Sequence, residues 1–221
     1  MMTRFVSTLA LVVAAAGSAA PAAVAQPRDL LDRAVAAWAR VKTARATFEQ
    51  TIDNPLTGRT LKASGEYQQQ RPGKLSVRFD DPATDRIVAD GKYVWLYLPS
   101  SAPGQVIRTV QQTSGTGTVD LSAQFLTSPR SRFVVTESGA LSVSGRAAHG
   151  YTLVPRSPDG AAFQKALVYI DDADATIRQF TVTEVNGVQR TVRLTSFTTN
   201  VPVEQSAFVF TPPVGVRVVA H

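Results

Sequence analysis

The chain has 221 residues, with 23 lysines and arginines against 17 aspartates and glutamates and a formal net charge of +6. It contains no cysteine and two histidines, which excludes disulfide scaffolds, thiolate metal sites, cysteine nucleophiles and cysteine-linked lipid anchors. The basic residues are spread along the chain and form no run of the kind that binds nucleic acid. The composition therefore predicts a mildly basic globular protein with little catalytic equipment and no nucleic-acid partner.

Residues 1–25 have the pattern of a secretory signal peptide. Arg4 supplies a short positive region, Phe5–Ala16 is apolar, and Ala23-Val24-Ala25 is a small-residue cleavage signal. A membrane span needs about 20 apolar residues, so this stretch is too short to be an anchor. We expect cleavage after Ala25, export to the periplasm, and a single unanchored domain over residues 26–221.

An amphipathic helix opens this domain, because Leu31, Ala34, Val35, Trp38 and Val41 recur at helical spacing. The apolar period then changes to two, which predicts short strands separated by turn residues. We expect these strands at 46–52, 60–69, 75–79, 86–89, 93–98, 106–111, 133–137, 151–155, 163–170, 177–184, 189–197 and 208–210.

Three local features refine this pattern. Residues 93–98 are apolar on both faces, with Tyr93, Trp95 and Tyr97 on one of them. Asp120 is placed to cap a short helix over 121–126, behind a Ser/Thr/Gly-rich loop over 113–118 that would let the helix move as a lid. Asn186-Gly187 predicts a hairpin with a type I′ turn.

About eleven short strands with one long and one short helix indicate a mainly β (α+β) fold. The strands follow one another with short turns and no internal repeat or linker, so a single antiparallel sheet curled around the helices is expected. Such a sheet has a broad apolar face, and the residues alone favour an ordinary core over a ligand cavity. A barrel of this size is nevertheless able to hold a small apolar ligand.

No motif assembles a nucleophile, a base and an orienting group. Asp172-x-Asp174-x-Thr176 resembles the start of a calcium loop, but Arg178 stands where that loop needs glycine, so a solvated hairpin turn is the better interpretation. Asp80, Asp81 and Asp85 flank Pro82 in a predicted loop and lack the burial that acid–base catalysis needs. We expect no enzyme, no metal and no cofactor.

The ordered motifs resemble one family, the periplasmic carriers of outer-membrane lipoproteins (LolA). The matching segments run through nearly the whole expected mature chain and are 46–50 (ATFEQ), 65–67 (GEY), 71–75 (RPGKL), 87–97 (IVADGKYVWLY), 177–180 (IRQF) and 208–216 (FVFTPPVGV). Each segment alone is weak evidence for the family. Together, and with a signal peptide and no lipid-attachment cysteine, the segments are specific to it.

The resemblance implies an unclosed antiparallel β-barrel with a helical lid and an apolar cavity for the acyl chains of lipoproteins. It also implies a monomer that takes cargo from an inner-membrane ABC transporter and passes it to an outer-membrane receptor. Arg71, followed by Pro72, matches the arginine that closes the empty carrier by bonding to the lid; from the residues alone, Arg71 either extends to solvent or bonds carbonyls of the lid. The expected cavity residues are Phe48, Tyr67, Leu75, Val77, Phe79, Trp95, Tyr97, Leu121, Phe125, Leu126 and Phe180.

Two alternatives compete with a carrier. One is another periplasmic lipid-binding or lipid-sensing half-barrel, such as a stress-signalling module, although these usually carry a second domain. The other is a structural or polysaccharide-binding β-domain, which predicts a cavity filled by the protein's own side chains. The outer-membrane receptor itself is disfavoured by the absence of cysteine.

Overall fold

The computed structural model describes residues 29–111, 120–157, 159, 161 and 163–220. The expected signal peptide and the whole of the expected 113–118 loop lie outside the described residues. Within the described part of the chain, no helix is long and apolar enough to span a bilayer.

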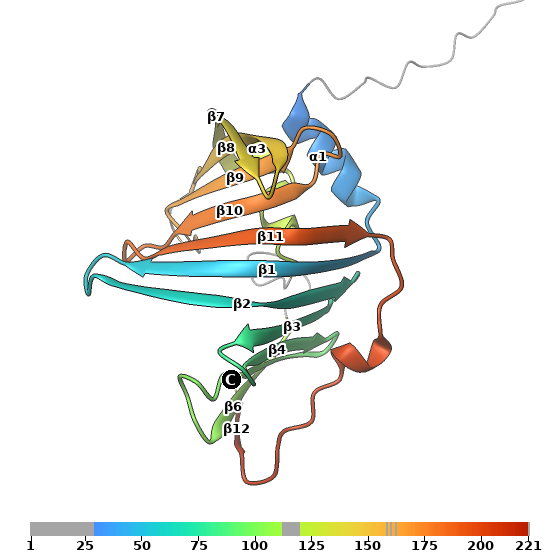
Figure 1. Ribbon diagram of the computed structural model, residues 1–221, viewed down its shortest axis with the longest axis vertical. Helices are drawn as coiled ribbons and strands as arrows, with labels where there is room; N and C mark the ends of the chain where they lie inside the picture. Colours follow the sequence, from blue (N-terminus) through green and yellow to red (C-terminus); the bar gives the residue numbers. More distant parts are fainter. Residues whose placement is uncertain (1–28, 112–119, 158, 160, 162, 221) are drawn as a thin grey trace, which may run out of the picture.

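The described strands form one twelve-stranded sheet in the order β12-β6-β5-β4-β3-β2-β1-β11-β10-β9-β8-β7. All neighbours are antiparallel except β12 and β6, which are parallel, and the two edge strands do not pair with each other, so the sheet curls without closing (Figure 1). The strands are β1 (Thr43–Asn54), β2 (Arg59–Gln70), β3 (Lys74–Asp81), β4 (Arg86–Asp90), β5 (Tyr93–Tyr97), β6 (Gln105–Val110), β7 (Phe133–Val143), β8 (Arg146–Pro155), β9 (Lys165–Asp171), β10 (Ile177–Thr183), β11 (Gln189–Thr199) and β12 (Arg217–Ala220).

The helices are few and short: α1 (Leu30–Ala39), α2 (Ala123–Leu126), α3 (Pro129–Arg132) and the 3₁₀ helix η1 (Gln205–Phe208). Asp29 caps α1 by accepting a hydrogen bond from the backbone N–H of Asp32 (2.9 Å). The predicted stripe of α1 is confirmed, because Leu31, Ala34 and Trp38 are buried in the main hydrophobic core. In Figure 1, α2 lies behind the central strands, on the inner face of the sheet.

The inner face of the sheet is built by the period-two alternation of the sequence. Along β1, Ala44, Ala46 and Phe48 are buried while the residues between them are exposed. The sheet bends at two register shifts. One is at Thr47/Phe48, where β1 pairs with β11, and the other is at Ser64/Gly65, where β2 pairs with β3. Phe48 pairs with Gly65 across β1 and β2, and a Cβ at Gly65 would lie 2.1 Å from the Arg78 carbonyl oxygen. Glycine is therefore required at this bend.

The C-terminal segment differs from the prediction of a strand at 208–210. Residues 205–208 form η1, and the final strand is β12, which extends the sheet next to β6 (Figure 1). Phe208 is buried, and the Phe210 ring lies 5.6 Å from Trp95 and 5.8 Å from Tyr97. The alternation of these two phenylalanines therefore reflects packing on the sheet and not strand pairing.

The hairpin at Asn186-Gly187 is confirmed, but its turn is not type I′. Gly187 has φ +85° and Asn186 has no positive φ, and the Gly187 N–H donates to the Glu184 carbonyl (2.9 Å). One glycine in the left-handed region ends a longer loop here.

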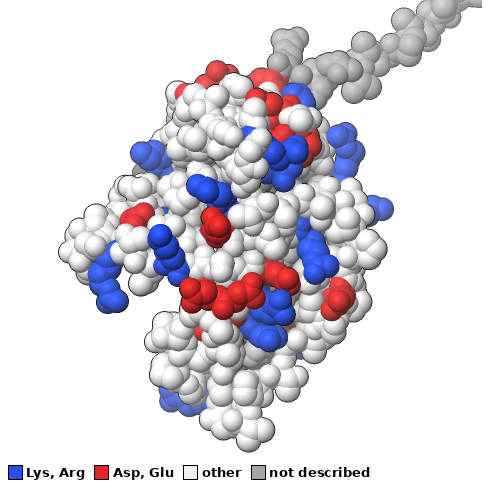
Figure 2. Space-filling view, viewed as in Figure 1, with Lys and Arg blue, Asp and Glu red and all other residues white. Residues whose placement is uncertain are grey.

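On the face in Figure 2, acidic and basic side chains are interspersed and do not gather by sign.

Candidate ligand-binding cavity and its lid

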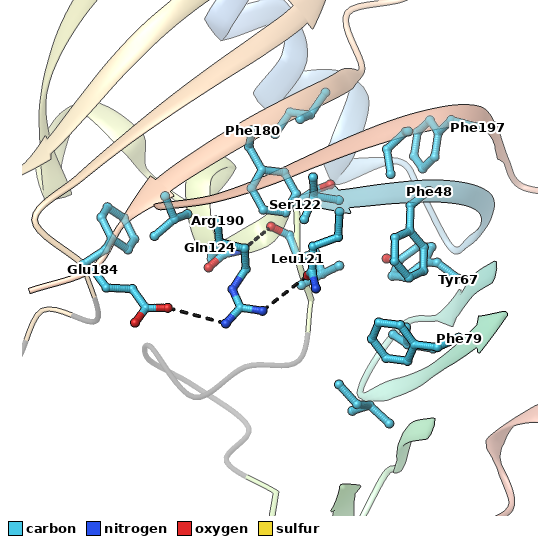
Figure 3. A pocket seen from close by; sticks show the side chains of 18 residues that line it. Phe48, Tyr67, Phe79, Leu121, Ser122, Gln124, Phe180, Glu184, Arg190 and Phe197 are labelled. Atoms are coloured by element: carbon cyan, nitrogen blue, oxygen red, sulfur yellow. Dashed lines mark hydrogen bonds and ion pairs between the residues drawn. The ribbon is translucent and has the colours of Figure 1, made fainter. Parts of the chain in front are cut away.

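A cavity of about 380 Å³ lies between the inner face of the sheet and the residues that begin α2. Its lining is mainly aromatic and aliphatic, with polar groups concentrated at one end (Figure 3). Phe48 and Phe79 contact each other edge to face at a centroid distance of 5.6 Å. The lining residues are Phe48, Gln50, Tyr67, Val77, Phe79, Ile87, Leu121, Ser122, Gln124, Phe163, Ile177, Phe180, Val182, Glu184, Arg190, Val192, Leu194 and Phe197.

Six of the residues expected in this cavity line it: Phe48, Tyr67, Val77, Phe79, Leu121 and Phe180. They come from β1, β2, β3, β10 and the start of the lid, so segments far apart in the sequence meet here. The alternation that marked their strands as half-buried also placed their side chains on the inner face.

Three other expected residues are buried near the cavity without lining it. Phe125 is completely buried, with its ring 5.2 Å from Phe180 and 6.1 Å from Phe163, so it anchors the lid to the sheet. Leu126 lines a smaller space beside α1. Leu75 is buried in the core, two residues nearer the start of β3 than Val77, which does line the cavity.

The prediction was wrong for Trp95 and Tyr97, which lie on the outer face of the sheet. Trp95 pairs with Val88, whereas the neighbouring Ile87, which lines the cavity, pairs with Leu96. Successive residues of a strand point to opposite faces, so Trp95 and Tyr97 point outward. Because β5 is apolar on both faces, its sequence did not show which face is the inner one.

The sequence reasoning missed much of the β10 and β11 wall. Val182 and Glu184 follow Phe180 at two-residue spacing, and Arg190, Val192 and Leu194 repeat this spacing on β11. Extending the alternation from Phe180 would have found them. The same extension along β1 leads from Phe48 to Gln50.

Arg71 connects β2, α1 and the segment Asp120–Leu126, which we call the lid. Its Nη1 donates to the carbonyl oxygens of Trp38 (2.7 Å) and Val41 (3.1 Å), and its Nε lies 3.2 Å from Asp120 Oδ2. The guanidinium also lies 5.3 Å from the centre of the Trp38 ring. The carbonyls that Arg71 bonds thus belong to the last turn of α1 and to the residues just after it, and its contact with the lid is the Asp120 carboxylate. Pro72 follows in the β2–β3 turn and is exposed.

The helix predicted over 121–126 is shorter, because α2 begins at Ala123 with Ser122 as its N-cap residue. Asp120 still supports its first turn, since its Oδ1 accepts a hydrogen bond from the Ala123 N–H (2.8 Å). Burial raises the pKa of this carboxyl, although hydrogen bonds from Ala123 and Gln69 and the charge of Arg71 act in the other direction. Burial, reinforced by the Asp120 charge, also raises the pKa of Tyr67 well above its usual value. The Tyr67 hydroxyl therefore stays protonated and donates to the Gln69 side chain.

Two of the carboxylates that resembled catalytic or calcium sites have structural partners, and one of them, Asp85, is buried (5% exposed) although the sequence predicted no burial. Asp85 accepts hydrogen bonds from the Ser100 N–H (3.1 Å) and hydroxyl (2.5 Å). Asp174 accepts from the backbone N–H (3.0 Å) and hydroxyl (2.6 Å) of Thr176 within the β9–β10 turn, and it pairs with Arg146 (3.0 Å) and with Arg178. This is the hairpin turn expected at 172–176.

A structural β-domain would fill its inner face with its own side chains. The open apolar volume between the sheet and the lid contradicts that expectation. The arrangement is able to remove an apolar ligand from water and to cover it with a short helix that Phe125 and the Arg71–Asp120 ion pair hold against the sheet.

Comparison with known proteins agrees with this geometry. The family model described as "Outer membrane lipoprotein carrier protein LolA" matches residues 39–211. The "Outer-membrane lipoprotein carrier protein" of Bordetella pertussis is 31% identical over 99% of this chain and 98% of its own length. The protein of the same description from Methylibium petroleiphilum is 26% identical over 90% of this chain and 94% of its own length.

Solved structures share the fold at lower sequence identity. An uncharacterized conserved protein from Thermus thermophilus superposes with a TM-score of 0.53 and 15% identity, over 87% of this chain and 97% of the other. MucB superposes with a TM-score of 0.50 and 17% identity, over 87% of this chain and 65% of the other. These likenesses establish the shared architecture alone.

Proposed function

The chain belongs to the LolA family of outer-membrane lipoprotein carriers, and we propose that it binds the acyl chains of lipoproteins in the cavity under the lid and carries them across the periplasm. The observation that supports this most directly is the cavity itself, whose walls are mainly aromatic and aliphatic. Its volume of about 380 Å³ is in the range of small-molecule pockets.

The energetics of such a carrier favour dispersed apolar contacts. Each buried CH₂ group contributes about 0.8 kcal/mol, so moving an acyl chain from water into the cavity is favourable without any specific bond. Release requires a step that opposes this gain. Closure of the empty carrier through Arg71 and Asp120, which are 3.2 Å apart, supplies such a step because it stabilises the unloaded state.

The protein acts in the periplasm. It is exported by a signal peptide cleaved after Ala25, and residues 26–221 act as one monomeric domain. Cargo arrives from an inner-membrane ABC transporter and leaves to an outer-membrane receptor. Binding and release involve no bond-making, so neither a catalytic group nor a cofactor takes part.

The proposal is tested by purifying the protein from the periplasm of lipoprotein-producing cells and examining it by native mass spectrometry. We expect a fraction of the protein to carry one acylated lipoprotein. The matched control is the same protein with Val182→Phe, which places a ring in the cavity and is expected to be recovered empty. A wild-type protein that is always empty in lipoprotein-rich cells contradicts carriage.

A further inference from the structure

One end of the cavity is polar. Arg190 Nη2 lies 3.5 Å from Glu184 Oε1, and Arg190 Nη1 donates to Gln50 Oε1 (3.3 Å). The side chains of Arg190 and Glu184 are 41% and 32% exposed, so this end of the cavity contacts solvent. Figure 3 shows Glu184 and Arg190 at one end, and Phe48, Tyr67 and Phe79 at the other.

This distribution gives the cavity a direction. Among its described lining residues Glu184 and Arg190 are the charged ones, and the carboxylate lies beside the guanidinium. An amphiphile would place its apolar chain against the aromatic rings and its polar group at this end, because an unpaired polar group is costly to bury.

We infer that this polar end, the Glu184–Arg190 pair with Gln50, receives the uncharged ester and amide groups that join acyl chains to a lipoprotein and discriminates against lipids with an anionic headgroup. The inference rests on the proposed function, since it names the part of the cargo that this end of the carrier contacts.

The arrangement of charges at this end favours an uncharged group. Glu184 already compensates the Arg190 charge, so the end of the cavity presents hydrogen-bonding groups with no net charge. An ester or amide carbonyl accepts from the guanidinium or from an amide of Gln50 or Gln124 without disturbing the pair. A phosphate must instead approach Arg190 beside the Glu184 carboxylate, where like charges repel.

The same strands provide a matched control on the other face of the sheet. Glu49 Oε2 and Arg193 Nη1 form an ion pair of 3.9 Å between β1 and β11. Their side chains are 61% and 50% exposed, and neither lines the cavity. Glu49→Gln thus removes the same charge as Glu184→Gln without changing the cavity.

The test compares two lipids that differ by one phosphate: 1-myristoylglycerol and 1-myristoylglycerol-3-phosphate. Each displaces the uncharged fluorescent probe N-phenyl-1-naphthylamine from purified protein, below the micellar concentration of either lipid. We expect the wild-type protein to bind the neutral lipid about tenfold more tightly. Glu184→Gln should strengthen binding of the phosphate lipid about tenfold and so remove the preference for the neutral lipid, because Arg190 becomes free for a charge-assisted bond.

Glu49→Gln should behave as the wild type with both lipids, and circular dichroism checks that each variant is folded. Equal affinities in the wild type, or an unchanged preference in Glu184→Gln, overturn the inference and leave the carrier function standing. If neither lipid displaces the probe from any of the proteins, the cavity does not take acyl chains, and the inference and the proposed function both fall.

Discussion

Arg71 Nε lies 3.2 Å from Asp120 Oδ2, and this ion pair joins β2 to the start of the lid. Because Arg71 also donates to the carbonyls of Trp38 and Val41, one side chain ties the lid to the end of α1 as well. The contact explains how a helix of four residues, too short to be stable alone, keeps its position over the cavity.

Arg71→Leu should leave loading of lipoprotein intact and impair transfer to the receptor. Hydrogen bonds to a charged group contribute about 1.5–3 kcal/mol each, so their loss removes much of the stabilisation of the closed, empty state. Bound cargo should then be retained at least about tenfold more tightly. The measurement is the fraction of loaded protein that delivers a purified lipoprotein to receptor-containing membranes.

Arg71→Lys is the companion variant, because it keeps the positive charge near Asp120 but loses the guanidinium geometry. We expect an intermediate defect in transfer. Normal transfer by Arg71→Leu would refute the role of this arginine in closure.

Asp120→Asn should become more stable relative to the wild type as the pH rises from about 4 to 7. The pKa of Asp120 is raised above 3.8 in the fold, so the folded state holds the proton more tightly than the unfolded chain. The stability from this group is therefore complete below the unfolded pKa and lost as the pH rises through the folded pKa. The uncharged variant does not titrate. Urea unfolding at both pH values measures the difference, and a relative loss of stability in the variant would show that the Arg71 pair outweighs burial.

The pKa of Asp171 is shifted in the opposite direction to that of Asp120. Burial alone would raise it, but the side chain of Arg146 and the backbone N–H groups of Ala173 and Asp174 have the larger combined effect and lower it to about 2. Its stabilisation is thus present above the unfolded pKa of 3.8 and is lost as the pH falls toward 2. Asp171→Asn should cost about 2 kcal/mol at neutral pH, and the difference from wild type should shrink in acid. A deficit that stays constant down to pH 2 would contradict the lowered pKa.

The sequence predicted the sheet more completely than the cavity. Alternation fixes which residues of a strand share a face, and this was enough for Phe48, Tyr67, Val77 and Phe79. It does not fix which face of a doubly apolar strand is the inner one, and Trp95 was misplaced for that reason. That choice depends on pairing with β4, where Val88 is opposite Trp95.

Long-range partners also limited the prediction of the lid. The Arg-Pro motif marked Arg71, but the sequence did not show that its hydrogen bonds reach Trp38 and Val41, which are 33 and 30 residues away. The contact with Asp120 likewise depends on how the chain returns to β2 after β6. Hydrophobic alternation does not mark Glu184 and Arg190, because they are charged residues on an otherwise apolar face.

Phe210→Ala should destabilise the protein without affecting the cavity. Its ring packs on Trp95 and Tyr97, and aromatic pairs contribute about 0.5–1.5 kcal/mol each, so we expect a loss of about 1–3 kcal/mol in the free energy of unfolding. Binding of N-phenyl-1-naphthylamine should be unchanged, because these rings lie on the outer face. A large loss of probe binding at full stability would show instead that the C-terminal segment contributes to the cavity.

Val182→Phe should close the cavity while preserving the fold. Val182 lines the cavity on β10, two residues from Phe180, and the open volume of about 380 Å³ has room for the added ring. Overpacking a filled core costs about 1–3 kcal/mol, whereas here the ring enters empty space, so the thermal midpoint should change little. Binding of N-phenyl-1-naphthylamine and of lipoprotein should fall at least about tenfold, because the ring takes the space that apolar ligand surface would fill.

Val185→Phe adds the same ring at a 72% exposed position in the following turn and should bind as the wild type does. Unchanged binding in Val182→Phe would place the acyl chains outside this cavity.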